Sequence, residues 1–130
     1  MITALYAGIL AILYVALTMF VVQGRYSYKI GLGDGGVPAL TQRIRIHGNF
    51  AEYVPFGLLL LFLVDYAGYS AWLIHMLGIM LVAGRIAHAW GIYCSPVTSP
   101  GRLAGMILTM LMIIIAAGFL LLEYLSAPQF

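Results

Sequence analysis

Charged residues are scarce in this sequence. Asp, Glu, Lys and Arg together make up 8% of the 130 residues, whereas hydrophobic residues make up 64%. A soluble domain of this length would lack the polar side chains needed to cover its surface. Six basic and four acidic residues give a formal net charge of +2, too small and too dispersed for a protein that follows nucleic-acid phosphates. The composition therefore predicts a membrane protein with no nucleic-acid partner.

Cysteine is almost absent, since Cys94 is the only one. A single cysteine rules out an intramolecular disulfide and any metal centre built on several cysteines. Neither His47 nor His88 has the neighbouring ligands that a metal site needs, so we expect no metal. The sequence also lacks a Gly-rich phosphate loop and a Ser-His-Asp arrangement, which excludes two common kinds of catalytic centre.

Long apolar runs dominate the rest of the sequence. A helix needs about 20 mainly apolar residues to cross the hydrocarbon core. Four segments meet this condition: Ile2–Gln23, Thr41–Val64, Tyr69–Tyr93 and Gly101–Leu125. The first run lacks the basic leader and cleavage pattern of a signal peptide, so we expect it to be retained. The short connections predict one all-α domain over residues 1–130, an up-and-down bundle of four transmembrane helices.

Basic residues gather in or beside the first and third connections of this predicted bundle. They are Arg25, Lys29, Arg43, Arg45 and Arg102. The second connection has no basic residue and contains Asp65. The positive-inside rule therefore places the first and third connections in the cytoplasm and both termini on the opposite side.

Small residues recur at helical spacing in three of the segments, a pattern typical of close helix packing. They are Ala4 and Gly8, then Ala83, Ala87 and Gly91, and finally Gly101, Gly105 and Thr109. We interpret all of them as packing positions without a chemical role.

Two of the expected helices carry polar side chains on one face. On the second segment, about one third of the circumference holds Arg45, Asn49, Glu52 and Tyr53. On the third segment, one face holds Arg85 and His88 and continues at Ile92 and Tyr93. A rise of about 1.5 Å per residue places both faces roughly 8–16 Å below the same membrane boundary. We therefore predict one polar cluster built from both helices.

Glu52 and Arg85 are predicted to lie deep in the hydrocarbon, where an unpaired charge costs several kcal/mol. Each should face protein or a water-filled cleft and pair with the other or with a ligand. An ion pair that only joins the two helices is the structural alternative. We favour a binding site, because buried ion pairs add little stability and the cluster has more polar groups than one pair needs.

Arg43 and His47 point to the other side of the second segment. We interpret Arg43 as a residue that reaches the lipid headgroups. His47 would contribute to the site of a neighbouring subunit if the chain forms a symmetric ring.

The polar cluster predicts a zwitterionic ligand that has more carboxylates than amines. Glutathione meets this description, because arginines would pair with its two carboxylates and Glu52 would accept its ammonium. A cytoplasmic opening suits a cytoplasmic thiol.

Two motifs resemble those of a known family. Residues 45–55, RIHGNFAEYVP, resemble the second-helix signature of the MAPEG proteins, the membrane-associated proteins of eicosanoid and glutathione metabolism. Residues 84–88, GRIAH, are similar to their third-helix motif, and the stretch 33–55 is most similar to the small bacterial branch. The resemblance implies a homotrimer in a bacterial inner membrane, with glutathione bound between subunits at the cytoplasmic side.

Carried over by position, the resemblance implies a set of glutathione-binding residues. They are Arg45, Asn49, Glu52, Tyr53, Arg85 and His88, with His47 and Arg25 approaching from an adjacent subunit. A further tyrosine of the family pattern falls on Ile92, with Tyr93 beside it. Arg102, at the start of the last segment, resembles the arginine that stabilises the thiolate and is the implied catalytic residue.

The resemblance implies a glutathione transferase or peroxidase that acts on a lipophilic electrophile entering from the lipid bilayer. A thiol with a pKa of about 8.5 is mostly protonated at neutral pH, and a guanidinium beside it favours the thiolate. Two alternatives stay open. One is a non-catalytic glutathione- or lipid-binding membrane protein of the same fold, and the other is a small membrane scaffold with a structural Glu52–Arg85 pair.

Overall fold

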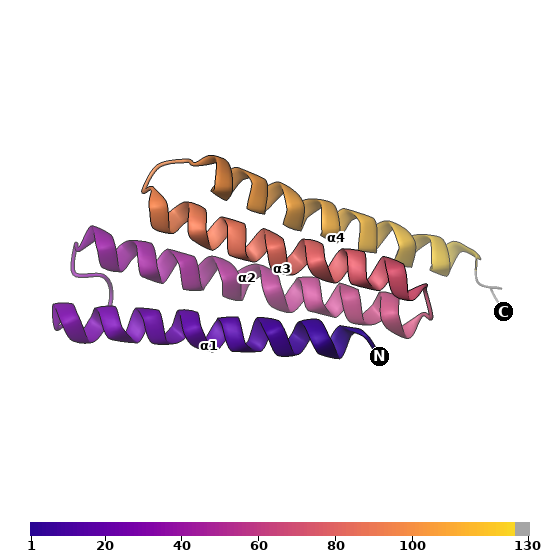
Figure 1. Cartoon of the computed structure of the whole chain (residues 1–130), viewed down its shortest axis with the longest axis horizontal. Helices are drawn as coiled ribbons and strands as arrows, with labels where there is room; N and C mark the ends of the chain where they lie inside the picture. Colours follow the sequence, from indigo (N-terminus) through magenta and orange to yellow (C-terminus); the bar gives the residue numbers. More distant parts are fainter. Residues whose placement is uncertain (127–130) are drawn as a thin grey trace.

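The computed structural model describes residues 1–126, which form four α-helices and no strand. The helices are α1 (Thr3–Tyr28), α2 (Pro38–Tyr66), α3 (Ala71–Cys94) and α4 (Pro100–Ser126). Each is long and apolar enough to cross a membrane. Figure 1 shows them side by side, with each helix running in the opposite direction to the one before it. The predicted all-α bundle of four transmembrane helices is therefore confirmed.

The helix boundaries differ from the predicted ones mainly at the first connection. α1 continues to Tyr28, beyond the predicted end at Gln23, because the segment in between contains no proline. The helix ends where Lys29 adopts the left-handed conformation, with a φ of 55°. α2 begins at Pro38, whose fixed φ suits the first turn of a helix. The first connection is consequently shorter than predicted, and Arg25 belongs to a helix.

The first and third connections lie at the same end of the bundle, on the left in Figure 1. The two connections at this end are residues 29–37 and 95–99. We call it the basic end, because these connections and the adjoining helix turns contain Arg25, Lys29, Arg43, Arg45 and Arg102. The N-terminus, the α2–α3 turn and the end of α4 lie at the other end. There Asp65 accepts hydrogen bonds from the amide and the hydroxyl of Thr3, at 2.7 and 2.9 Å. These bonds fasten the start of α1 to the end of α2.

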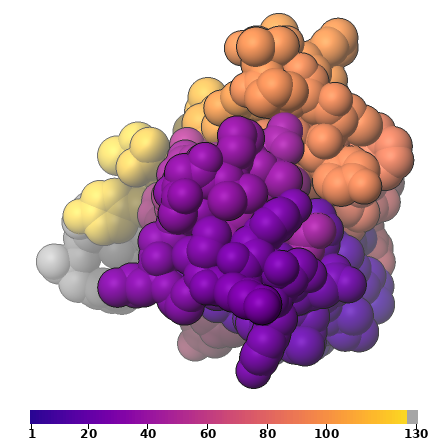
Figure 2. All heavy atoms as spheres, turned by 90° about the vertical axis from the view of Figure 1, so that its left-hand side faces the viewer, coloured from indigo at the N-terminus to yellow at the C-terminus, as the bar shows by residue number. Residues whose placement is uncertain are grey.

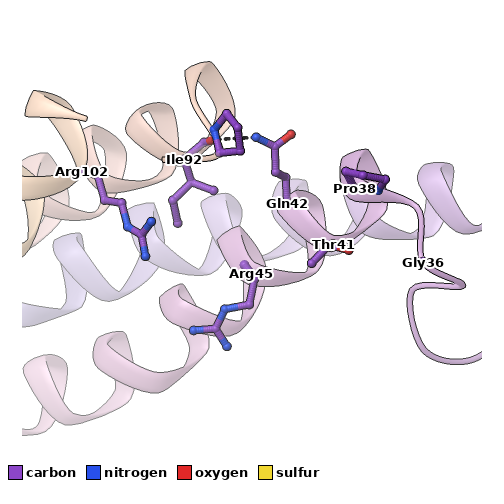
Figure 3. Close-up of a pocket in the computed structure, with 8 residues that line it drawn as sticks. Gly36, Pro38, Thr41, Gln42, Arg45, Ile92 and Arg102 are labelled. Carbon is purple, nitrogen blue, oxygen red and sulfur yellow. Dashed lines mark hydrogen bonds between the residues drawn. The ribbon is translucent and has the colours of Figure 1, made fainter. Parts of the chain in front are cut away.

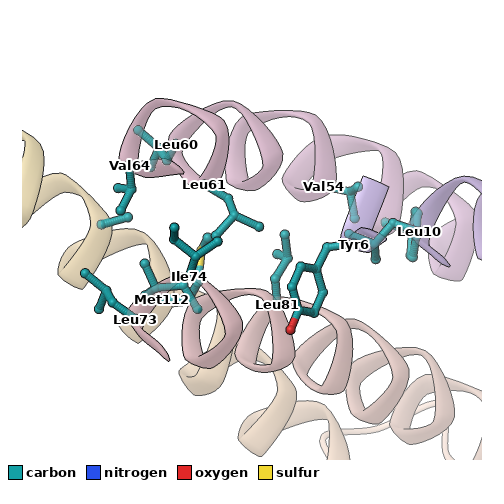
Figure 4. Close-up of a cluster of buried hydrophobic side chains, with 13 residues drawn as sticks. Tyr6, Leu10, Val54, Leu60, Leu61, Val64, Leu73, Ile74, Leu81 and Met112 are labelled. Carbon is teal, nitrogen blue, oxygen red and sulfur yellow. The ribbon is translucent and has the colours of Figure 1, made fainter. Parts of the chain in front are cut away.

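An apolar core fills the half of the bundle away from the basic end. Figure 4 shows side chains from all four helices meeting there. Its fully inaccessible members are Leu61, Val64, Leu77, Leu81, Met112 and Ala116. Because the core occupies this half, polar side chains on α2 and α3 are left to gather toward the basic end.

Small residues bring α3 and α4 into close contact. A Cβ on Gly105 would collide with the backbone of Gly84 and His88, and one on Gly91 would collide with the backbone of Arg102. The packing role predicted for Gly91 and Gly105 is therefore confirmed. This close approach also fixes where His88 and Arg102 lie relative to each other.

Replacing Gly105 with Ala should lower the thermal stability of the protein. The added methyl group has no space between the two backbones, and overpacking of this kind costs about 1–3 kcal/mol. Gly118→Ala is the matched control on the same helix, because a Cβ there meets nothing within 4 Å. Thermal unfolding in detergent would measure both. Equal unfolding temperatures for the two variants would mean that α3 and α4 separate without cost.

Candidate functional site

Arg85 lies at the centre of a buried polar cluster between α2, α3 and α4. Its side chain is 2% exposed. It donates from Nη1 to Asn49 Oδ1 at 2.6 Å, from Nε to Thr109 Oγ1 at 3.0 Å and from Nη2 to the Gly105 carbonyl at 3.3 Å. The Tyr53 ring centre lies 5.1 Å from its guanidinium carbon, within cation–π range. The polar faces of α2 and α3 therefore meet at one level, as predicted.

Glu52 does not take part in this cluster. Asn49, and not Glu52, is the α2 side chain that accepts a hydrogen bond from Arg85. Asn49 and Tyr53, one turn apart, face α3, whereas Glu52 is rotated by about 100° from Tyr53 and is exposed on the single chain. The alternative prediction, a Glu52–Arg85 ion pair that joins α2 and α3, is therefore wrong.

The exposed face of α2 carries Arg45 and Glu52, two turns apart. Glu52 is fourteen residues from each end of α2, or about 21 Å at 1.5 Å per residue. A carboxylate open to the hydrocarbon at this depth would cost several kcal/mol. This face therefore requires a polar partner from outside the single chain.

Arg45 and Arg102 line one pocket at the basic end. Figure 2 looks at this end, where the first connection, in purple, lies beside the third, in orange. The pocket has a volume of about 350 Å³, and Figure 3 shows both guanidinium groups extending into it from α2 and α4. Its other lining residues are Gly36, Pro38, Thr41, Gln42, Ile92 and Pro96. The volume falls within the usual range of small-molecule sites, about 300–1,000 Å³.

Hydrogen bonds hold the walls of this pocket in place. Gln42 donates to the Ile92 carbonyl at 3.2 Å, which joins α2 to the last turn of α3. Asp34 accepts from the Gly36 amide at 3.0 Å and the Thr41 hydroxyl at 2.8 Å. Both hydrogen bonds hold the pKa of Asp34 below its ordinary value, and the bond from the Gly36 amide has the larger effect. These bonds therefore stabilise the first connection fully at any pH above the pKa that Asp34 has in the unfolded protein. The stabilisation is lost as the pH falls through the lower pKa that Asp34 has in the folded protein.

His88 lies between the buried cluster and the pocket. It is 3% exposed and lies about one helical turn from both Arg85 and the pocket residue Ile92. Among residues 1–126, two arginines and no acidic residue line the pocket, so its positive charge favours an anionic ligand. Residues 1–126 contain no group of three or more His, Cys, Asp or Glu side chains that could hold a metal ion.

Two of the predicted site residues point away from the pocket. Tyr93 is 58% exposed and packs beside Phe20 of α1, with ring centres 6.0 Å apart. Arg25 donates to the Gly33 carbonyl at 2.8 Å, within the first connection of its own chain. On the single chain, neither side chain joins Arg45 and Arg102.

His47 and Arg43 belong to the contact between α1 and α2. His47 Nε2 lies 3.1 Å from the Thr18 hydroxyl. Arg43 donates to the Phe20 carbonyl at 3.0 Å, and its guanidinium carbon lies 4.2 Å from the centre of the Phe20 ring. Arg43 therefore links α2 to α1, a role that the prediction of a headgroup residue did not include.

Thr109 and Gln42 are site residues that the sequence reasoning missed. The sequence predicted only packing for Thr109, yet its hydroxyl accepts from Arg85 and donates to the Gly105 carbonyl at 2.9 Å. A hydroxyl within the apolar middle of α4 was the available signal. Gln42 precedes Arg45 by three residues and so continues the polar face of α2, which was a usable signal at helical spacing.

The fold and the site together define a four-helix membrane protein with a buried polar cluster around Arg85 and a basic pocket at one end. The chain belongs to the MAPEG family, whose model matches residues 3–122. It is 40% identical over 93 residues to the inner membrane protein YecN of Escherichia coli strain K12, covering 72% of this chain and 71% of YecN. YecN of Escherichia coli O6:H1, strain CFT073, matches with the same identity and coverage. The family resemblance of residues 45–55 and 84–88 is confirmed.

Proposed function

We propose that this chain is a glutathione-dependent membrane transferase or peroxidase that acts on lipophilic electrophiles. The pocket into which Arg45 and Arg102 both extend is the observation that supports the proposal most. Glutathione carries two carboxylates and a thiol, and guanidinium groups suit both the pairing of carboxylates and the stabilisation of a thiolate. Membership of the MAPEG family favours the same ligand.

The active unit in this proposal is a homotrimer. Arg45 and Glu52 are exposed on a single chain although Glu52 lies halfway along a membrane-spanning helix. A neighbouring subunit and glutathione would together cover this face, with Arg45 on a carboxylate and Glu52 on the ammonium. His47 lies toward the α1 side of the chain, so it would approach the site of the next copy, whereas Arg25 donates to the Gly33 carbonyl of its own chain. A ring closes when one face of each copy meets a different face of the next.

Arg102 is the catalytic residue in this proposal. A free thiol has a pKa of about 8.5, and a nearby guanidinium lowers it by favouring the charged form. Because arginine remains protonated, Arg102 acts electrostatically and not as a base. In a transfer, the thiolate sulfur bonds to the electrophilic carbon and the leaving group departs with the electron pair. In peroxide reduction, the sulfur takes one peroxide oxygen and an alcohol leaves, and a second glutathione then forms the disulfide and releases water.

The expected location is the inner membrane of a bacterium, with the basic end toward the cytoplasm. The relative YecN is named as an inner membrane protein. The concentration of basic residues at one end supports the orientation. This orientation opens the pocket to the compartment that contains glutathione, while the lipophilic electrophile would enter from the bilayer.

A conjugation assay tests the proposal. Purified protein in detergent is mixed with glutathione and a chromogenic lipophilic electrophile, and the thioether is measured against the uncatalysed rate. The proposal predicts faster product formation together with the ultraviolet absorbance of bound thiolate. Stabilisation by glutathione without thiolate or product would instead favour a non-catalytic binding protein of the same fold. If glutathione neither stabilised the protein nor gave product, both interpretations would be contradicted.

A further inference from the structure

A second hollow lies at the basic end, beside the last turns of α1. It has a volume of about 450 Å³ and is lined by Val22, Arg25, Tyr26, Lys29, Ile30 and Gly31. None of these residues lines the pocket of Arg45 and Arg102. Lys29 is the only lysine in the sequence and has no part in the proposed chemistry. The hollow therefore needs an explanation of its own.

The side chains along this part of α1 change from apolar to basic. Val15, Met19 and Val22 are separated by four and three residues, which places them on one face of α1. Val15 and Met19 are each 58% exposed. Arg25 and Lys29 follow at the end of the helix, four residues apart. An apolar strip that lies within the membrane thus ends at two cations where the helix leaves it.

Within residues 1–126, neither of these two cations forms an ion pair with a carboxylate. Asp34 is the acidic residue of the basic end, and its two oxygens already accept from the Gly36 amide and the Thr41 hydroxyl. The remaining acidic residues lie halfway along the bundle or at its other end: Glu52, Asp65 and Glu123. The charge of Lys29 is therefore available to an external anion.

We propose that this hollow binds the headgroup of an anionic phospholipid, with an acyl chain along Val15, Met19 and Val22. Juxtamembrane cations attract anionic headgroups, and each contributes a measurable share of the binding. Tyr26, which is 82% exposed at the rim, is a residue type that favours the headgroup region. A hollow with an apolar strip on one side and cations on the other suits a phospholipid, whose phosphodiester is charged and whose acyl chains are apolar. It suits a free phosphate less, because a free phosphate would leave the strip uncovered.

Lipid titrations of the wild type and two Lys29 variants test the proposal. Protein in a neutral detergent is titrated with phosphatidylglycerol, phosphatidylcholine or inorganic phosphate while the unfolding temperature is followed. Phosphatidylglycerol should raise the unfolding temperature of the wild type at lower concentration than phosphatidylcholine, and any effect of inorganic phosphate should be the same in the wild type and Lys29→Gln. Lys29→Gln should weaken the apparent affinity for phosphatidylglycerol about fivefold, whereas Lys29→Arg should retain it.

Two results would overturn the proposal. Identical phosphatidylglycerol curves for the wild type and Lys29→Gln would remove Lys29 from any lipid site. Stabilisation by inorganic phosphate that is as strong as that by phosphatidylglycerol and is lost in Lys29→Gln would assign the hollow to a free anion. The glutathione-dependent rate of Lys29→Gln should equal that of the wild type. A failure of the glutathione proposal therefore leaves the lipid titrations interpretable.

Discussion

Replacing Arg102 with Gln should lower kcat for glutathione conjugation about 100-fold to 1,000-fold while glutathione still stabilises the protein. The guanidinium of Arg102 extends into the pocket that also contains Arg45. Loss of one preorganised group that stabilises developing or reacting negative charge has an effect of this size. Binding is expected to persist because Arg45 still pairs with a carboxylate of glutathione. The measurements are kcat at saturating glutathione and the absorbance of the bound thiolate.

Two further variants make the Arg102 result specific. Arg102→Lys keeps the positive charge but loses the planar fork, so its kcat should lie between those of the wild type and Arg102→Gln. Lys29→Gln removes the same charge at the same end of the bundle without touching the pocket lining, and its kcat should not change. Normal turnover and a normal thiolate signal in Arg102→Gln would remove Arg102 from the mechanism.

Replacing Asn49 with Leu should destabilise the protein by about 3 kcal/mol. Asn49 provides the shortest hydrogen bond of the buried Arg85 guanidinium, at 2.6 Å, and leucine cannot accept one. A buried charge that loses a partner retains the full cost of its desolvation. Thermal or denaturant unfolding in detergent measures the effect.

A second substitution should recover much of this stability. In Asn49→Leu combined with Arg85→Met, both polar partners are replaced by apolar groups of similar size, and no unpaired charge remains. Thr109 would still donate to the Gly105 carbonyl, so its hydroxyl stays partnered. The double variant should therefore be more stable than Asn49→Leu alone. Strictly additive losses across the two single variants and the double variant would show that the two side chains do not interact.

The four helices and the level of the polar cluster were predictable because both depend on counting along the chain. Apolar runs identify the spans, and the rise per residue places Asn49 and Arg85 at the same depth. Their hydrogen bond confirms that placement. Local sequence is sufficient for these features because each depends on one helix and its distance from a membrane boundary.

The partner of Arg85 was not predictable in the same way. Whether Asn49 or Glu52 meets Arg85 depends on the rotation of α2 about its own axis, which is set by packing against α1, α3 and α4. Thr109 follows Arg85 by 24 residues and belongs to α4. It reaches the cluster because Gly105, which has no side chain, lets the backbones of α3 and α4 approach each other closely. The role of Arg43 likewise required the position of α1, because its guanidinium covers the Phe20 ring. Such contacts follow from packing between helices and not from spacing within one.

A glutathione titration followed by thermal unfolding is the most direct test of the pocket of Arg45 and Arg102. Glutathione at about 100 times its dissociation constant should add about 2.7 kcal/mol to the unfolding free energy of the wild type. Arg45→Gln should need a higher concentration for the same shift, and the diethyl ester of glutathione, which lacks both carboxylates, should stabilise the wild type less. An unfolding temperature of the wild type that stays constant at every glutathione concentration would contradict the account.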